Sequence, residues 1–253
     1  MERRRRHHDA PGDAGRHRLT VASVETWWAR AAEDSAAFRD PASVASLIDG
    51  ALQSDPETRD AAARALAWVV KALEDDPVDE SMALLARRLP ELVRGLADRD
   101  PFYNGQMISI ARRVPIDART VDALLDLIAS TPSSDDRVLP VCALAMCDDG
   151  AWTDRVEVAL AGYLADPVTF GAAVEAFYCR ERRIRRSETA QALSRGVLTA
   201  RFPNTRRAIG TLCGLLQTDF AALAEAALHD LAAARPELHD EIAEMRRLRA
   251  RSL

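Results

Sequence analysis

Apolar residues recur along most of the chain at the three- and four-residue spacing of an amphipathic helix. After Asp55, for example, Ala62, Leu66, Val69 and Leu73 fall on one side of a helix with about 3.6 residues per turn. Similar stripes occur at Val156, Leu160, Tyr163 and Leu164, and at Phe220, Leu223, Ala227 and Leu231. Sustained alternation of β-branched residues and hairpin turn signals between such runs are both missing. The pattern therefore predicts an all-α protein.

Proline and short polar clusters divide these apolar blocks. Asp-Pro dipeptides occur at residues 40/41, 55/56, 76/77, 100/101 and 166/167. Aspartate accepts hydrogen bonds from the free N–H groups of a first helical turn, and proline at the next position needs no donor. We expect further helix starts near Pro132, Pro203 and Pro236, and near Asp117, Asp149 and Thr218. Starts of this kind predict about a dozen short helices with tight connections.

One stretch resembles the core motif of a HEAT repeat. The motif Asp-Pro-x-x-Arg-x-x-Ala-x-x-Ala-Leu is matched by Asp55, Pro56, Arg59, Ala62, Ala65 and Leu66. Weaker copies are Asp166, Pro167, Ala173, Ala176 and Phe177, where Phe170 replaces the arginine, and Pro203, Arg206, Ile209 and Leu212. The resemblance implies an all-α, right-handed α-α superhelix of the HEAT or armadillo kind, in which stacked helix pairs share a core. A closed helical bundle is the alternative architecture.

The 253 residues divide into an arm and one helical domain. Residues 1–18 contain the run Arg3–Arg6 and almost no apolar residue, so we predict a disordered basic arm, followed by a HEAT-like helical-repeat domain over residues 19–253. Residues His7–Arg18, which follow these arginines, contain no apolar segment of the kind found in an export signal. No stretch of the sequence resembles a membrane span either, which predicts a cytoplasmic protein without a membrane partner. The pattern does not indicate an oligomeric state.

Candidate chemistry is sparse. The acidic run 74–80 contains a DDxxD string, but Pro77 separates Asp75 and Asp76 from Asp79 and Glu80, which are typical of a first helical turn. The histidines lack metal-ligand spacing, and no nucleotide-binding or hydrolase motif occurs. Four cysteines without a CxxC pair predict buried, reduced thiols. The sequence therefore predicts no catalytic residue, metal site or cofactor, and favours a non-enzymatic interaction module or scaffold.

Charge is unevenly distributed. The net charge is −5, yet residues 180–207 contain nine arginines and two acidic residues, whereas residues 19–165 contain 14 basic and 25 acidic ones. Arginine binds carboxylates and phosphates through paired N–H groups. The predicted partner-binding residues are Arg180, Arg182, Arg183, Arg185, Arg186, Arg206 and Arg207.

Three interpretations of this arginine cluster remain open: an ordinary solvated face, a docking surface for an acidic protein, and a nucleic-acid contact. The negative overall charge and the lack of interleaved aromatic residues count against the last. The partner that we predict is therefore an acidic protein.

Tryptophans near carboxylates give an alternative function. Trp27-Trp28 and Trp152-x-Asp154 invite comparison with HEAT-like DNA glycosylases of the alkylpurine type, which use tryptophans and an aspartate around the lesion. This resemblance implies a DNA-binding or DNA-repair protein with Trp152 and Asp154 as the first candidates. After Trp27-Trp28 the first carboxylates are Glu33 and Asp34, so the local match is poor and we expect those tryptophans to cap the first helix pair.

Overall fold

The computed structural model describes residues 19–76, 78–97, 101–147, 150–178, 184–200 and 204–251. These ranges contain α-helices and short 3-10 helices and no strand, so the all-α prediction is confirmed. The predicted arm, residues 1–18, lies outside the described residues. The helices are α1 (Val21–Glu33), η1 (Ser35–Arg39), α2 (Pro41–Ala51), α3 (Pro56–Leu73), α4 (Glu80–Val93), η2 (Arg94–Ala97), α5 (Pro101–Ala111), α6 (Ala118–Ser130), α7 (Ser134–Leu144), α8 (Asp154–Tyr163), α9 (Phe170–Tyr178), α10 (Ser187–Thr199), α11 (Asn204–Leu215), α12 (Ala221–Ala234), η4 (Pro236–Leu238) and α13 (His239–Arg251).

Aspartate side chains begin several helices where the sequence predicts them. Helix α2 starts directly after Asp40, whose carboxylate accepts hydrogen bonds from two N–H groups of the first turn. Helix α3 starts directly after Asp55, which accepts a hydrogen bond from the N–H of Thr58 at 3.0 Å. Asp117 caps α6 in the same way. Because each cap satisfies N–H groups that have no partner within their helix, these boundaries are set by local sequence.

Two helices begin later than their Asp-Pro dipeptides predict. Helix α4 starts at Glu80 and is capped by Asp79 rather than by Asp76. Asp166 accepts a hydrogen bond from the N–H of Val168 in a turn, and α9 starts only at Phe170. In both places the aspartate lies ahead of a short turn that leads into the helix.

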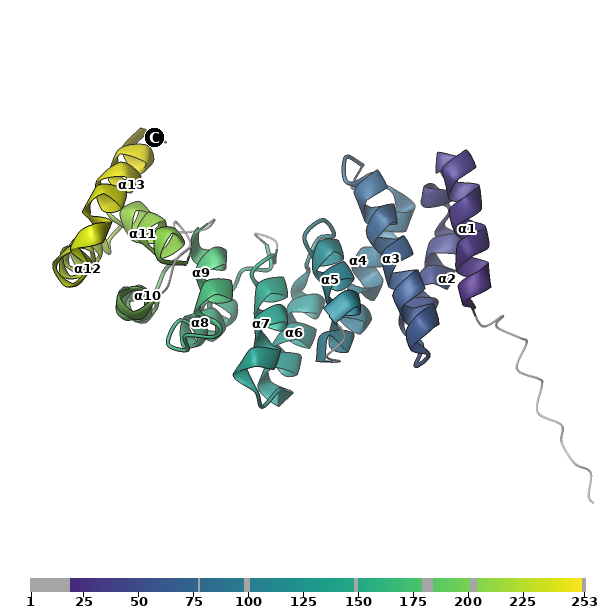
Figure 1. Cartoon of the computed structure of the whole chain (residues 1–253), viewed down its shortest axis with the longest axis horizontal. Coiled ribbons are helices and arrows are strands. Elements are labelled where there is room, and N and C mark those ends of the chain that lie inside the picture. Colours follow the sequence, from purple (N-terminus) through teal and green to yellow (C-terminus); the bar gives the residue numbers. More distant parts are fainter. Residues whose placement is uncertain are drawn as a thin grey trace, which may run out of the picture.

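The helices form two rows along the length of the molecule (Figure 1). Each odd-numbered helix packs against the next odd-numbered helix from α1 to α13; we call these helices the odd row. Helices α2, α4 and α6 pack in sequence, as do α8, α10 and α12; we call these six the even row. Consecutive helices such as α2 and α3, or α6 and α7, join the rows. The molecule is therefore elongated, with α1 and α13 at opposite ends.

One continuous hydrophobic core lies along and between the rows. In α3 the small residues Ala62, Ala63 and Ala65 are fully buried beside Leu66 and Val69. Small side chains let neighbouring helices approach closely while the larger ones fill the space between them. Among the described residues, no helix is long and apolar enough to cross a membrane.

Glycine is required where α10 approaches the end of α8 and the start of α9. A Cβ atom on Gly196 would lie 2.6 Å from the backbone oxygen of Leu164 and 2.5 Å from Cε2 of Phe170. Both distances are shorter than van der Waals contact, and one of them involves backbone. Gly162 in α8 offers the opposite case, because a Cβ atom there would meet no other atom within 4 Å.

We predict that Gly196→Ala lowers the free energy of unfolding by about 1–3 kcal/mol, because the added methyl group forces a backbone shift. Gly162→Ala should raise it by about 0.5–1 kcal/mol, because alanine favours the helix and has room. Urea unfolding followed by circular dichroism measures both. A Gly196→Ala variant as stable as the natural protein would contradict the close packing of α10.

Candidate partner-binding surface

The structure distributes the predicted arginine cluster over both rows. Arg206 and Arg207 lie in the first turn of α11, in the odd row. Arg185 and Arg186 lie at the start of α10, in the even row. The other three predicted residues, Arg180, Arg182 and Arg183, lie outside the described residues. The four described arginines therefore do not form one patch on one row.

Each of these four arginines has a carboxylate neighbour within the chain. Nε of Arg206 lies 2.9 Å from Oε1 of Glu241 in α13, and Arg207 pairs with Glu175 in α9. Arg185 pairs with Asp154 at 3.8 Å and Arg186 with Glu188 at the same distance. The excess of arginine in this part of the sequence is therefore partly neutralised, by acidic residues of other helices for Arg185, Arg206 and Arg207 and by a neighbour in the chain for Arg186.

A buried glutamate fixes the backbone of the arginine segment. Glu157 of α8 is only 1% exposed, and its carboxylate accepts hydrogen bonds from the backbone N–H groups of Arg185 and Arg186, each at 3.1 Å. A carboxylate at this place satisfies N–H groups ahead of α10 and complements the positive end of the helix dipole. Sequence analysis missed this residue, although an acidic side chain directly after Val156, within an apolar stripe, was a usable signal.

A groove crosses four successive helices of the odd row. One of its two cavities has a volume of about 320 Å³ and is lined by Arg112, Val138, Cys142, Ala145, Met146, Val168, Gly171, Ala172, Glu175, Asn204 and Arg207. A larger cavity of about 520 Å³, between the α8–α9 turn, the end of α10 and the start of α11, shares Val168 and Asn204 with it. We call the two adjoining cavities the odd-row groove. Of the predicted site residues, Arg207 lines this groove.

The groove carries both signs of charge. Glu175 and Arg207 pair with each other across α9 and α11. Arg112, at the end of α5, is exposed and has no ion pair with any described carboxylate. The groove therefore presents one uncompensated positive charge beside a neutralised pair. A ligand carboxylate at this place would find an available guanidinium group.

A close approach between two helices shapes the groove floor. A Cβ atom on Gly171 would lie 2.4 Å from Nδ2 of Asn204. The missing side chain of Gly171 therefore leaves room for the Asn204 amide to lie directly on α9. An amide at this position can both donate and accept hydrogen bonds, which suits the backbone of an extended peptide.

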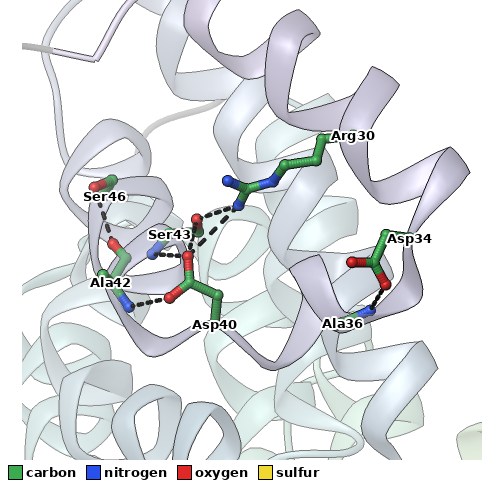
Figure 2. A network of polar contacts seen from close by, with 7 residues as sticks. All are labelled: Arg30, Asp34, Ala36, Asp40, Ala42, Ser43 and Ser46. Carbon is green, nitrogen blue, oxygen red and sulfur yellow. Dashed lines mark hydrogen bonds and ion pairs between the residues drawn. The ribbon is translucent and has the colours of Figure 1, made fainter.

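Another cavity, of about 230 Å³, lies between α1 and α2. Arg30 donates a hydrogen bond to Oγ of Ser43 at 2.7 Å and pairs with Asp40 at 3.5 Å (Figure 2). Asp40 also accepts hydrogen bonds from the Ser43 hydroxyl and from the N–H of Ala42. These bonds, that from the Ser43 hydroxyl above all, lower the pKa of Asp40. Because this network already uses its polar groups to join α1 to the start of α2, we interpret it as structural.

The acidic run that contains the DDxxD string is also held by arginines. Asp76 and Asp79 both pair with Nη1 of Arg39, at 2.7 and 2.8 Å. Glu74 pairs at 2.7 Å with Arg113, in the turn after α5. Among the described residues, no group of three or more histidine, cysteine, aspartate or glutamate side chains could hold a metal ion.

Three of the four cysteines are described, and none of these three forms a disulfide. Cys147 and Cys213 are buried, whereas Cys142 is partly exposed and lines the odd-row groove. Burial raises the pKa of Cys213 to about 11. Burial also raises the pKa of Cys142, while the positive charge of Arg112 acts in the opposite direction. Cys179 lies outside the described residues.

Trp152 and Asp154, the candidate residues of the DNA-repair alternative, differ in exposure: Trp152 is buried and Asp154 is exposed. Trp152 is 5% exposed, and its ring packs edge-on against Phe177 with a centroid distance of 5.8 Å. Asp154 begins α8, with a side chain about two-thirds exposed beside Arg185. The Trp152 ring is therefore not available for stacking on a base in this conformation.

Comparisons with known proteins found no match to this chain among family models, curated proteins or solved structures.

We predict that Glu157→Ala lowers the free energy of unfolding by about 1–3 kcal/mol, because backbone N–H groups at the start of α10 lose their acceptor. Glu188→Ala is the matched control, since Glu188 is an exposed glutamate in the first turn of α10, and it should change stability by less than about 0.5 kcal/mol. Thermal and urea unfolding compare the two variants. Equal stability of both would contradict the anchoring role of Glu157.

We also predict that the thiols differ in reactivity toward iodoacetamide at about pH 8, close to the ordinary thiol pKa. In a Cys179→Ser background, Cys142 should react first, because Cys147 and Cys213 are buried. The pKa of Cys213 rises from 9.0 to about 11, which leaves about 1% of the thiolate that an unburied cysteine would have at this pH. Arg112→Gln should slow labelling of Cys142, because the positive charge that favours its thiolate is lost. Peptide mass spectrometry identifies the labelled thiol; labelling of Cys213 before Cys142 would contradict the burial pattern.

Proposed function

We propose that the chain is a non-enzymatic protein-interaction module, or scaffold, that binds an acidic segment of a protein partner along the odd-row groove. The observation that carries this proposal is the groove itself, which runs from the end of α5 across α7 and α9 to α11 and is lined by Arg112, an arginine without an ion pair to any described carboxylate. Grooves across stacked helix pairs are the usual binding surfaces of helical-repeat proteins.

The proposal includes a HEAT-like, right-handed solenoid. The three segments that resemble HEAT repeats support it, because they precede or begin α3, α9 and α11, which all belong to the odd row. Equivalent segments of a repeat protein must fall in the same row, separated by whole helix pairs. The sequential packing of odd with odd and even with even helices has the same form. The cytoplasmic location predicted from the sequence remains part of this proposal.

The chemistry of the groove favours an acidic partner. Arg112 offers a guanidinium group without competition, whereas a carboxylate that reaches Arg207 must compete with Glu175. Arg206 lies one residue away and is held by Glu241 in the same manner. A partner carboxylate can replace Glu175 or Glu241 at little cost in free energy, because an exposed ion pair contributes only about 0.2–1 kcal/mol. The predicted cluster would thus contribute through Arg206 and Arg207, at the α11 end of the groove.

Binding of a fluorescein-labelled glutamate-rich peptide, measured by fluorescence anisotropy, tests this function. We expect saturable binding, protection of Cys142 from alkylation by the bound peptide, and an increase in Kd of about tenfold in Arg112→Glu. Arg119→Glu is the matched control, because Arg119 is exposed, belongs to the even row and has no ion pair with a described carboxylate. It should leave Kd unchanged.

Two outcomes would contradict the proposal. Equal weakening by Arg112→Glu and Arg119→Glu would show that only net charge matters. Binding of duplex DNA in preference to the peptide, with affinity that falls steeply as salt rises, would favour the DNA-binding alternative. In that case Asp154→Asn and Trp152→Phe become the first variants to compare for base excision.

A further inference from the structure

Aromatic rings and cations alternate on the surface of the first three helices of the odd row. Trp68 of α3 is 47% exposed, and its ring packs edge-on against Trp28 of α1 at a centroid distance of 6.1 Å. Nζ of Lys71 lies 4.9 Å from the centre of the Trp68 ring, and Cζ of Arg64 lies 4.8 Å from the centre of the Phe102 ring in α5. We call these five residues the aromatic–cation patch.

The two cations of this patch are uncompensated. Arg64 and Lys71 are exposed, and neither pairs with a described carboxylate. Nearby arginines behave differently: Arg39 pairs with two aspartates, and Arg113, in the turn after α5, pairs with Glu74. A cation over an aromatic ring contributes only about 0.5–1 kcal/mol at an exposed site and still attracts a carboxylate. The patch therefore combines a half-exposed indole with two available positive charges.

Spacing along α3 sets the chemistry that would fit the patch. Arg64 and Lys71 are seven residues apart, which is about 10 Å along a helix, and Trp68 lies between them on the same side. Two carboxylates seven residues apart on a partner helix have the same separation. An apolar side chain three or four residues after the first carboxylate would then meet Trp68. Tryptophan and arginine are also the residue types that contribute most to binding at protein interfaces.

A nucleic-acid strand fits these features less well. One face of the Trp68 ring carries Lys71, and one face of the Phe102 ring carries Arg64, so part of the surface that a base needs for stacking is occupied. Residues 19–165, which include the patch, contain 14 basic and 25 acidic side chains. The acidic surroundings would repel a nucleic acid, which carries a negative charge at every nucleotide. A protein segment with two carboxylates carries only two negative charges, and Arg64 and Lys71 can neutralise both.

We infer that the aromatic–cation patch is a second binding surface, which takes an acidic amphipathic helix of a protein partner. Two carboxylates of that helix contact Arg64 and Lys71, and an apolar side chain between them packs on Trp68. The inference extends the proposed interaction function to a surface that shares no residue with the odd-row groove. The patch can therefore bind whether or not the groove does.

The test uses a synthetic helical peptide of about 18 residues, roughly five turns, with two glutamates at seven-residue spacing and a leucine between them. Binding to the full chain is measured by peptide anisotropy and by the tryptophan emission of the protein. We expect saturable binding, an emission change that Trp68→Phe removes, and an increase in Kd of about tenfold or more in the double variant Arg64→Gln, Lys71→Gln. Both substitutions are on the surface, and an unchanged melting temperature shows that the variant is folded.

The matched control is Arg87→Gln, because Arg87 is an exposed arginine of α4, in the even row, without an ion pair to a described carboxylate. It should leave Kd unchanged, and a peptide with glutamine in place of both glutamates should not bind. Absence of saturable binding, or equal binding by the double variant, would overturn the inference. Loss of binding in Arg112→Glu with protection of Cys142 would assign the peptide to the groove instead. Tighter binding of single-stranded oligothymidylate, lost in the double variant, would make the patch a nucleic-acid site.

Discussion

The packing of each helix against the helix two positions further along the chain is the constraint on which the rest of this structure depends. The helices are short, and a single amphipathic helix cannot shield its apolar face from water on its own. In the odd row α3 is enclosed between α1 and α5, and α11 between α9 and α13. Buried alanines such as Ala62 and Ala65 and the glycine Gly196 bring neighbours close enough to close the core. What remains of each odd-row helix forms one extended surface.

Ion pairs on that surface join the same neighbours. Arg113, in the turn after α5, pairs with Glu74 after α3, and Arg206 of α11 pairs with Glu241 of α13. Pairs of this kind stabilise an exposed surface by only about 0.2–1 kcal/mol each, but they cancel charge locally. Uncompensated cations such as Arg64, Lys71 and Arg112 are therefore more informative about a partner than the number of arginines in the sequence.

The fold class and many helix starts could be predicted from sequence because their causes are local. A carboxylate such as Asp55 acts on N–H groups within three residues, and apolar spacing is visible within one helix. Pro90 inside α4 and Pro140 inside α7 show the limit of such rules, since proline there lies within a helix instead of ending it. The neutralisation of Arg207 could not be predicted, because Glu175 is 32 residues away and adjacent only after α9 and α11 stack. The contact between Trp28 and Trp68 could not be predicted for the same reason, because these residues are 40 positions apart and meet only when α1 and α3 stack.

Continuity of the odd row explains why both proposed surfaces lie on it. In the even row α6 and α8 make little contact, and an exposed ion pair between Asp122 and Arg155 connects them. The described helices of the odd row have no such interruption, so α5 contributes Phe102 to the aromatic–cation patch while Arg112, directly after α5, lines the groove. Surfaces held by one packed row keep a fixed separation, which lowers the ordering cost of binding. A partner with two acidic segments at that separation would bind the second at a high effective concentration once the first is bound.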